Sequence, residues 1–355
     1  MIYLDYQATT PLAPEARAAM LRWLADDGFA NPHSAHRMGR AAAAAVEVAR
    51  EQVAALLPPG GRVVFTASAT EALNLAIRGG QGGPVAVSAI EHAAVRDTAR
   101  WQGIDVELPV GSDGVIDPEA VLPDGARLVA VMQVNNEIGT IQPVARLAER
   151  AKAAGALFLC DAVQGGGKLA PPRGADLIAL SAHKLHGPKG IGALWVRDGV
   201  NLTPLIHGGG QEGGLRSGTL SPALCAGFGA AAALAAARME EDAAHVSALW
   251  DAAREVLSRW TLNGSETLRW KGNLNLRLDG LDVSRLMSEC RGVMFSAGSA
   301  CASGSGRPSH VLRAIGLGDA QAKTSIRLGF GRYTTREEVV EACRALDAAA
   351  KAQGA

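Results

Sequence analysis

Polar side chains that could do chemistry follow five of the expected strands, at the point where each strand ends. They supply hydroxyls, two imidazoles, amides, carboxylates and an amine: Ser68-Ala69-Thr70, Glu91-His92, Asn135-Asn136-Glu137, Asp161 with Gln164, and Ser181 with His183 and Lys184. In an open α/β sheet, ligands bind beyond the carboxyl ends of the strands. We therefore expect these groups to meet at one edge of a sheet.

Three of these groups together match the needs of pyridoxal 5'-phosphate (PLP). The amine of Lys184 can form a Schiff base, and the carboxylate of Asp161 can keep the pyridine nitrogen protonated, so that the ring takes up electrons. The free N–H groups of the helix that contains Thr70 suit a phosphate. Taken singly, Lys184 would be a surface lysine, Asp161 a cap or turn residue and His92 a helix-start or core histidine. Their convergence favours the cofactor site, with His92 stacked on the ring.

The elements that must position these groups alternate between strand-like and helical patterns. Apolar runs without strict alternation predict strands that are buried on both faces, as in a mostly parallel sheet. We expect strands at 62–66, 85–88, 104–108, 127–134, 156–160, 176–180 and 191–196, and helices at 14–24, 40–57, 71–78, 93–101 and 144–154. This order of elements predicts an α/β fold.

The last third of the chain changes character. A Gly-rich stretch, 207–218, precedes an Ala-rich helical region, 222–260, which we expect to be interrupted. Beyond it we expect a strand at 273–278, a helix at 284–289, a strand at 325–330 and a final helix with Thr335 and Glu338 as a capping box. These patterns predict a large domain over 15–260 and a smaller α+β domain made of 1–14 and 261–355.

Composition excludes several classes of protein. With 355 residues, 35 basic and 35 acidic, the chain has a formal net charge of +0, so there is no global field to attract nucleic acid or an anionic membrane. Its five cysteines contain no C-x-x-C pair, which argues against a disulfide framework and a zinc site. The first residues lack an export signal, and no apolar run reaches the roughly 18 residues of a membrane span. We expect a cytoplasmic protein without a metal.

The segments that carry the polar residues resemble those of the cysteine desulfurases of the class V aminotransferase family. The matching segments are 3–11, 31–34, 69–72, 91–92, 134–139, 161–164, 181–184 with 187–190, 208–212 with 216–219, 298–301 and 325–327. The 181–190 stretch, which resembles the cofactor lysine loop, is the most specific. The resemblance implies PLP fold type I, with a large domain whose mostly parallel sheet is flanked by helices, a smaller α+β domain, and a homodimer.

The resemblance also implies roles around the cofactor. Lys184 would bind PLP and then serve as the base that removes the substrate α-proton, Asp161 would pair with the pyridinium nitrogen, and Gln164 would hydrogen-bond the phenolic oxygen. His92 would stack on the ring. The phosphate would be held by a group of small polar residues and backbone groups: Ala69, Thr70, Ser181, His183 and, from the other protomer, Thr219.

On the substrate side, the resemblance assigns the carboxylate of L-cysteine to Arg327 and to Asn136, which would also contact the cofactor. Cys301 would attack the sulfur of the bound cysteine, leaving a persulfide and releasing alanine. A sulfur acceptor must be a soft thiolate, which only cysteine provides. The Gly- and Ser-rich segment 298–306 predicts a flexible loop, which fits a group that approaches the substrate and then delivers sulfur. The other cysteines lie in strand or helix patterns and are predicted to be packing residues: Cys160, Cys225, Cys290 and Cys343.

Several positions depart from the family pattern. Ser68 stands where the family usually has Gly, and Val163 stands where Thr or Ser is frequent. Ala182 stands where Gly is frequent, and His186 stands where Tyr is frequent. Ser68 could donate its hydroxyl to the phosphate.

The expected activity is a PLP-dependent cysteine desulfurase that supplies sulfur for iron–sulfur clusters or thio-cofactors and passes it to an acceptor protein. The long stretch between Cys301 and residues 311–316 resembles the cluster-assembly group. A selenocysteine lyase or another class V aminotransferase remains an alternative, as does an inactive sulfur-carrier or assembly subunit.

Overall fold

A computed structural model describes residues 1–25, 28–80, 82–103, 105–298 and 309–355 of the chain. Its largest sheet has seven strands in the order β2-β8-β7-β6-β5-β3-β4. Neighbouring strands are parallel except that β8 runs antiparallel to both β2 and β7, which confirms the predicted mostly parallel α/β sheet. The strands are β2 (Gly61–Thr66), β3 (Val85–Ser88), β4 (Asp105–Leu108), β5 (Leu128–Met132), β6 (Leu157–Asp161), β7 (Leu177–Ser181) and β8 (Gly192–Arg197).

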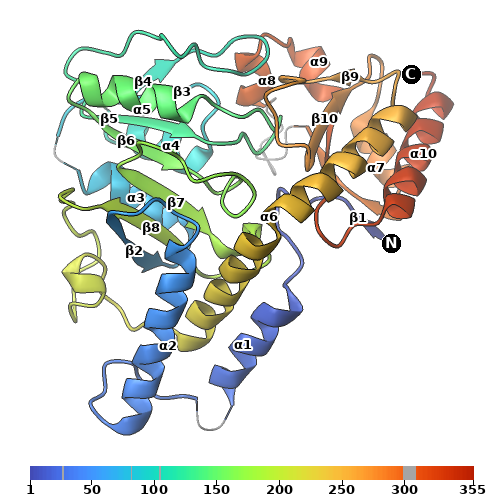
Figure 1. Cartoon of the computed structure of the whole chain (residues 1–355). Coiled ribbons are helices and arrows are strands. Elements are labelled where there is room, and N and C mark those ends of the chain that lie inside the picture. Colours follow the sequence, from blue (N-terminus) through green and yellow to red (C-terminus); the bar gives the residue numbers. More distant parts are fainter. Residues whose placement is uncertain (26–27, 81, 104, 299–308) are drawn as a thin grey trace.

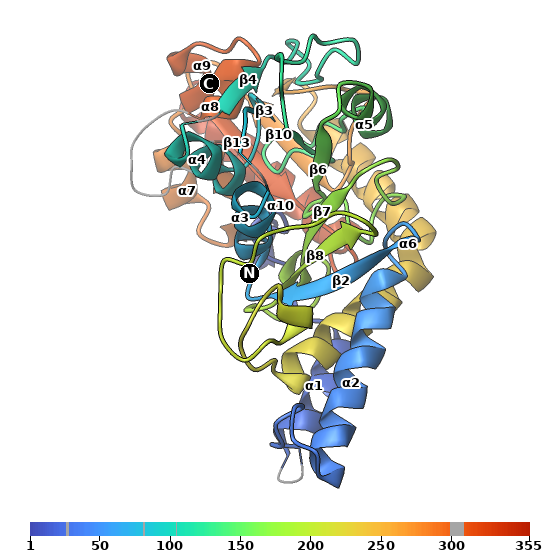
Figure 2. The same cartoon turned by 90° about the vertical axis from the view of Figure 1, so that its left-hand side faces the viewer.

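The central strands are buried on both faces because successive side chains enter different cores. In β7, Leu177 and Ala179 pack into one hydrophobic cluster, while Ile178 and Leu180 pack into another on the opposite face. Helices cover both faces, with α3 and α4 on one side and α5 and α6 on the other (Figure 1, Figure 2). The helices of this part are α1 (Pro14–Leu24), α2 (Arg37–Ala54), α3 (Ala69–Arg78), α4 (Ala93–Trp101), α5 (Val144–Ala153) and α6 (Pro222–Val256).

Helix α6 is continuous over 35 residues, so the predicted interruption of the 222–260 region is wrong. Its first half belongs to the core beside the large sheet, and its second half belongs to a second core. By length and composition, α6 is also the one helix in the described part of the chain that could cross a membrane. Core helices of soluble proteins meet the same criterion, and α6 packs against α1, α2 and α10 (Arg336–Ala352). The criterion is therefore weak evidence for a membrane span.

The second core lies under a four-stranded sheet in the order β12-β13-β10-β9, beside a short parallel pair of β1 and β11. The strands are β1 (Ile2–Tyr3), β9 (Thr261–Leu262), β10 (Asn273–Arg277), β11 (Val293–Met294), β12 (Ser296–Ala297) and β13 (Ser325–Gly329). The helices are α7 (Val283–Glu289), α8 (His310–Ala314), α9 (Asp319–Lys323) and α10 (Arg336–Ala352). The predicted capping box of α10, Thr335 with Glu338, is confirmed. The division into domains at 15–260 and 1–14 with 261–355 stays a prediction.

The four cysteines predicted to be packing residues are free and buried, which confirms that prediction: Cys160, Cys225, Cys290 and Cys343. Burial raises the pKa of each of these thiols, so their reactive thiolate forms are disfavoured. Cys301 lies outside the described residues.

Candidate functional site

A cavity of about 300 Å³ opens beyond the carboxyl ends of β5, β6 and β7. The structure brings ten of the predicted site residues to its wall: Ala69, Thr70, His92, Asn136, Asp161, Gln164, Ser181, His183, Lys184 and Arg327. Thr219 is exposed and is not part of this wall. The contact of Thr219 with the cofactor of another protomer stays a prediction. In the described part of the chain, no group of three or more His, Cys, Asp or Glu residues could hold a metal ion.

Asp161 is the last residue of β6, where the strand delivers its carboxylate to the cavity floor. The side chain is buried, and its Oδ1 accepts a hydrogen bond of 2.9 Å from the backbone N–H of Val163. Burial raises the pKa of Asp161, and the nearby charges of His92 and Lys184 oppose that rise. A carboxylate in such a place favours a cationic partner, because a paired charge costs less to bury than an isolated one. The protonated nitrogen of a pyridine ring meets this need.

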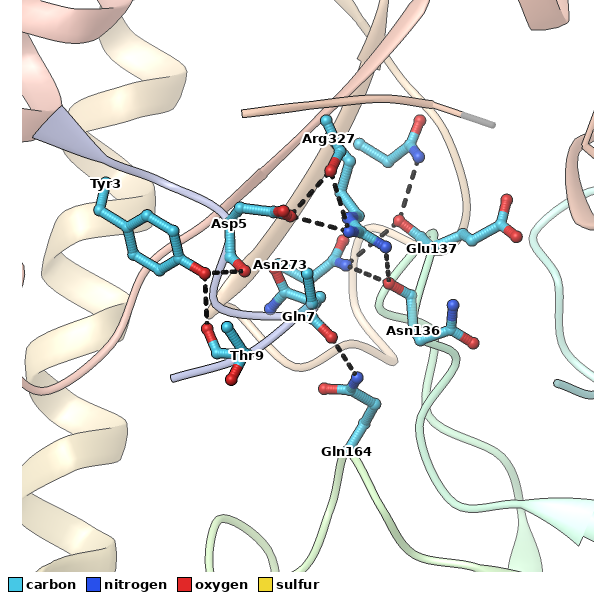
Figure 3. Close-up of polar contacts among 12 residues, drawn as sticks. Tyr3, Asp5, Gln7, Thr9, Asn136, Glu137, Gln164, Asn273 and Arg327 are labelled. Atoms are coloured by element: carbon cyan, nitrogen blue, oxygen red, sulfur yellow. Dashed lines mark hydrogen bonds and ion pairs between the residues drawn. The ribbon is translucent and has the colours of Figure 1, made fainter. Parts of the chain in front are cut away.

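Gln164 presents an unsatisfied polar atom to the same cavity. Its Nε2 donates to the backbone carbonyl of Gln7 over 3.0 Å (Figure 3), and its buried Oε1 has no partner among the described residues. Buried polar atoms are nearly always hydrogen-bonded in native proteins. The unpaired amide oxygen of a residue that lines this cavity therefore indicates a polar ligand, as PLP would be.

The start of α3 forms one end of the cavity. Ser68 caps this helix, and its Oγ accepts a hydrogen bond from the N–H of Glu71 over 3.3 Å. The N–H groups of Ala69 and Thr70 have no acceptor within the helix because they belong to its first turn. A helix N-terminus with free N–H groups suits an anion. The carboxylate of Glu71 is held by Arg216, with an Nε–Oε1 distance of 2.7 Å, which ties the Gly-rich segment 207–218 to this end of the site.

His183 lies beside the lysine in the wall of the cavity. Its Nδ1 is 3.1 Å from the hydroxyl oxygen of Thr9. Burial, and after it the charge of Lys184, lowers the pKa of His183 to about 4. The ring is therefore neutral at pH 7, and it would contact a phosphate as a hydrogen-bond donor rather than as a cation.

His92 caps α4 and also forms part of the cavity wall. Its Nδ1 accepts a hydrogen bond of 3.1 Å from the N–H of Ala94. In a neutral ring this leaves the hydrogen on Nε2. The helix-start role considered for His92 is thus present, and it fixes the orientation of the ring that would stack on the cofactor.

Lys184 ends a short 3₁₀-helix, η1 (Ala182–Lys184), that directly follows β7. Its Nζ donates to the backbone carbonyl of Gln7 and, over 2.9 Å, to that of Ala8. The hydroxyl of Thr10 donates to the carbonyl of His183 over 3.0 Å and accepts from the N–H of His186 over 2.8 Å. Residues 5–10, which we call the N-terminal strap, are therefore hydrogen-bonded to the lysine loop.

Sequence reasoning did not assign the strap to the site. Gln7 and Ala8 line the cavity, and their contacts with Lys184 and Gln164 use backbone carbonyls, which carry no signal in residue type. The one available signal was the match of residues 3–11 to the family.

His186, which stands where the family frequently has Tyr, adopts a positive φ of 69°. This conformation is uncommon outside glycine and persists only where the surroundings hold it. Burial lowers the pKa of His186 to about 4, and its Nδ1 lies 2.9 Å from the carbonyl oxygen of Pro11. A neutral ring that donates there holds the residue that follows the strap against the lysine loop. Of the other departures, Val163 lines the cavity and Ala182 is buried in η1.

Glu91, the neighbour of His92, is a fully buried carboxyl group beneath the site. Its Oε1 accepts hydrogen bonds from Ser88 Oγ over 2.8 Å and from the N–H of Met132 over 2.7 Å, and its Oε2 has no partner among the described residues. Burial, and after it the charge of Asp161, raises the pKa of Glu91 to about 8. Glu91 is therefore mostly protonated at neutral pH.

The substitution Glu91→Gln is expected to remove a pH dependence of stability. Because the folded pKa of about 8 exceeds the ordinary value of 4.5, the folded protein binds the extra proton between these values, and stability falls as pH rises through that window. Gln does not ionise. Urea unfolding gives the free energy of unfolding of both proteins. The value for the variant minus the value for the wild type should be larger at about pH 8.5 than at about pH 5, by on the order of a few kcal/mol. An equal difference at both pH values would contradict the assignment.

The sequence profile of class-V aminotransferases matches residues 2–341. The chain belongs to the class-V aminotransferase family. Members of this family depend on PLP, the cofactor predicted from the sequence. This family member is 43% identical to the cysteine desulfurase IscS of Rickettsia rickettsii (strain Iowa) over an alignment of 362 residues. The alignment covers 95% of this chain and 88% of the relative. The corresponding identity with IscS of Rickettsia bellii is 42%, with the same coverage.

Solved structures give the same fold for this class-V chain. A NifS-like protein matches with a TM-score of 0.89 at 31% identity and covers 98% of both chains. The NifS-like protein of Rickettsia africae ESF-5 matches with a TM-score of 0.90 at 28% identity, covering 98% of this chain and 99% of that one. The predicted PLP fold type I is confirmed.

Proposed function

We propose that this class-V family member is a PLP-dependent cysteine desulfurase that converts L-cysteine to L-alanine and keeps the sulfur as a persulfide on Cys301. The observation that carries the proposal is the meeting of Asp161, Lys184 and Arg327 on one cavity. A buried anion, an amine and a buried guanidinium are what an amino-acid substrate on PLP requires. The 43% identity to a cysteine desulfurase IscS over 95% of the chain supports the same activity.

The residues of this chain would divide the work by position. Arg327 and Asn136 bind the substrate carboxylate, and Lys184 first holds the cofactor and then moves the α-proton. Asp161 stabilises the protonated ring nitrogen. The bound cofactor supplies the electron sink that allows the α-proton and then the C–S bond to be lost. Gln164 would contact the phenolic oxygen and His92 the ring face, while Ala69, Thr70, Ser181, His183 and a partner's Thr219 hold the phosphate.

Sulfur transfer is the role we propose for Cys301. Its thiolate attacks the substrate sulfur, the S–S bond forms and the C–S bond breaks, and the electron pair of that bond stays with the substrate carbon, which a proton then converts to alanine. The persulfide passes its sulfur to an acceptor protein that builds iron–sulfur clusters or thio-cofactors. A homodimer, a cytoplasmic location and the two-domain division at residue 260 complete the proposal.

The test is incubation of the PLP-loaded protein with L-cysteine, followed by mass spectrometry of the protein and of the released amino acid. We expect alanine together with a mass increase of one sulfur atom on the peptide that contains Cys301. A parallel reaction with L-selenocysteine distinguishes a selenocysteine lyase, which would turn over that substrate and leave L-cysteine unchanged. Protein that binds no PLP, or that releases no alanine, would indicate an inactive carrier or assembly subunit.

A further inference from the structure

The guanidinium group of Arg327 is held by protein groups at three points. Arg327 lies in β13 and is 3% exposed. Its Nη2 donates to Asp5 Oδ1 over 2.8 Å and to Ser296 Oγ over 3.3 Å, and its Nη1 donates to the carbonyl of Asn136 over 3.1 Å (Figure 3). Its Nε has no partner among the described residues. Asp5 makes the only ion pair with this arginine in the described part of the chain.

Asp5 is itself fixed in place. Ser296 Oγ donates to its Oδ1 over 2.9 Å, so one hydroxyl group bridges the carboxylate and the guanidinium. The phenol of Tyr3 donates to the carbonyl of Asp5 over 3.1 Å, and the backbone of Asp5 forms a parallel bridge with Gly329 of β13. A carboxylate anchored at its backbone and its side chain can hold its partner in one orientation.

Asp5 contacts Arg327 from outside the cavity. Arg327 and Asn136 line the cavity, whereas Asp5 and Ser296 do not. The carboxylate therefore orients the guanidinium from behind and leaves the cavity side for a ligand. It also compensates most of the charge of a nearly buried arginine, which would otherwise be costly to bury.

We propose that Asp5 is a positioning residue that sets the orientation of Arg327 for the substrate α-carboxylate, and that it thereby determines the selectivity of the site for amino acids over simple amines. The inference rests on the proposed role of Arg327. A bidentate contact between a guanidinium and a carboxylate depends on the plane of the arginine fork, and Asp5 fixes that plane. Removal of Asp5 takes away the charged anchor of Arg327 and leaves its guanidinium with the weaker contacts to Ser296 and to the carbonyl of Asn136.

The test compares the binding of two probes to the PLP-loaded protein, through the change that each causes in the visible absorbance of the cofactor. L-alanine has the carboxylate, and ethylamine lacks it. Asp5→Ala is expected to weaken L-alanine binding by about tenfold or more, because hydrogen bonds to charged groups are lost or misaligned, and to leave ethylamine binding within about twofold. With L-cysteine, we expect KM to rise by a similar factor and kcat to change less.

Two further variants separate positioning from charge and from folding. Asp5→Asn keeps an acceptor for Arg327 and is expected to recover most of the L-alanine affinity. Asp5→Glu keeps the charge but moves it by one methylene, and it is expected to weaken L-alanine binding by about threefold or more. If Asp5→Ala does not fold, the binding of the two probes to Asp5→Glu tests the proposal in its place. Asp279→Ala, a loss of charge at an exposed position, is the matched control and should bind both probes as the wild type does.

The proposal is overturned if Asp5→Ala, or Asp5→Glu in its place, binds L-alanine as tightly as the wild type, or loses L-alanine and ethylamine equally. These binding measurements do not require desulfuration. A wild-type protein that releases no alanine from cysteine, yet shows the selective loss in Asp5→Ala, would refute the proposed function and leave the role of Asp5 standing.

Discussion

Lys184→Ala is expected to abolish the visible absorbance band of the PLP-loaded protein and to lower alanine release from L-cysteine by on the order of 10³-fold or more. The reason is that one amine performs two tasks, covalent attachment of the cofactor and transfer of the α-proton. The place of Lys184 directly beyond β7, with its Nζ in the wall of the cavity that Asp161 closes, supports both tasks. Absorbance spectra before and after borohydride, and amino-acid analysis of the reaction, measure them separately.

Lys189→Ala is the matched control, because Lys189 belongs to the same loop and its side chain is exposed. It should keep the band and the activity. A Lys184→Ala protein that retains a borohydride-sensitive band would place the cofactor on another amine, and the assignment of this cavity would then be wrong.

Cys301→Ala is expected to keep the visible band and to lose the persulfide completely, with alanine release lowered by on the order of 10²-fold or more. The residues assigned to PLP are unchanged in this variant, so PLP should bind as in the wild type. Without a thiolate acceptor, however, the sulfur of the substrate has no nucleophile to receive it. Intact-protein mass spectrometry after addition of L-cysteine detects the persulfide, and amino-acid analysis measures the released alanine.

Cys290→Ala provides the control for the loss of a thiol, because Cys290 is buried and its pKa is raised by burial. This variant should form the persulfide at the wild-type rate. Release of alanine at the wild-type rate from Cys301→Ala would show that the persulfide mechanism is wrong, and it would favour the selenocysteine lyase or another class V activity.

Local patterns determined most of the large sheet and its helices. The strand ends that carry Asp161 and the loop of Lys184 could be predicted because a buried strand has a continuous apolar run, and because the residue after it is placed by the strand itself. The start of α10 could be predicted because a capping box uses side chains three residues apart. In each case the interacting groups are close in the sequence.

The continuity of α6 shows how tertiary packing overrides a local preference. Gly227 and Gly229 lower helix propensity near its start, which favours an interruption. In the structure another helix approaches each glycine closely. A Cβ atom on Gly227 would lie 2.5 Å from Met20 Cγ of α1, and a Cβ atom on Gly229 would lie 2.7 Å from Ala49 Cα of α2. The missing side chains allow α1 and α2 to pack against α6, and that contact stabilises the helix as a whole.

The sequence by itself determined which groups this protein offers for chemistry: an amine, a carboxylate, a helix start with free N–H groups and an arginine. Only the tertiary structure decided what orients them. Lys184 donates to a carbonyl 177 positions away, and Arg327 pairs with Asp5 across 322 positions. Contacts at such separations follow no repeat or spacing, because they form only when the N-terminal strap, β13 and the lysine loop pack together around one cavity.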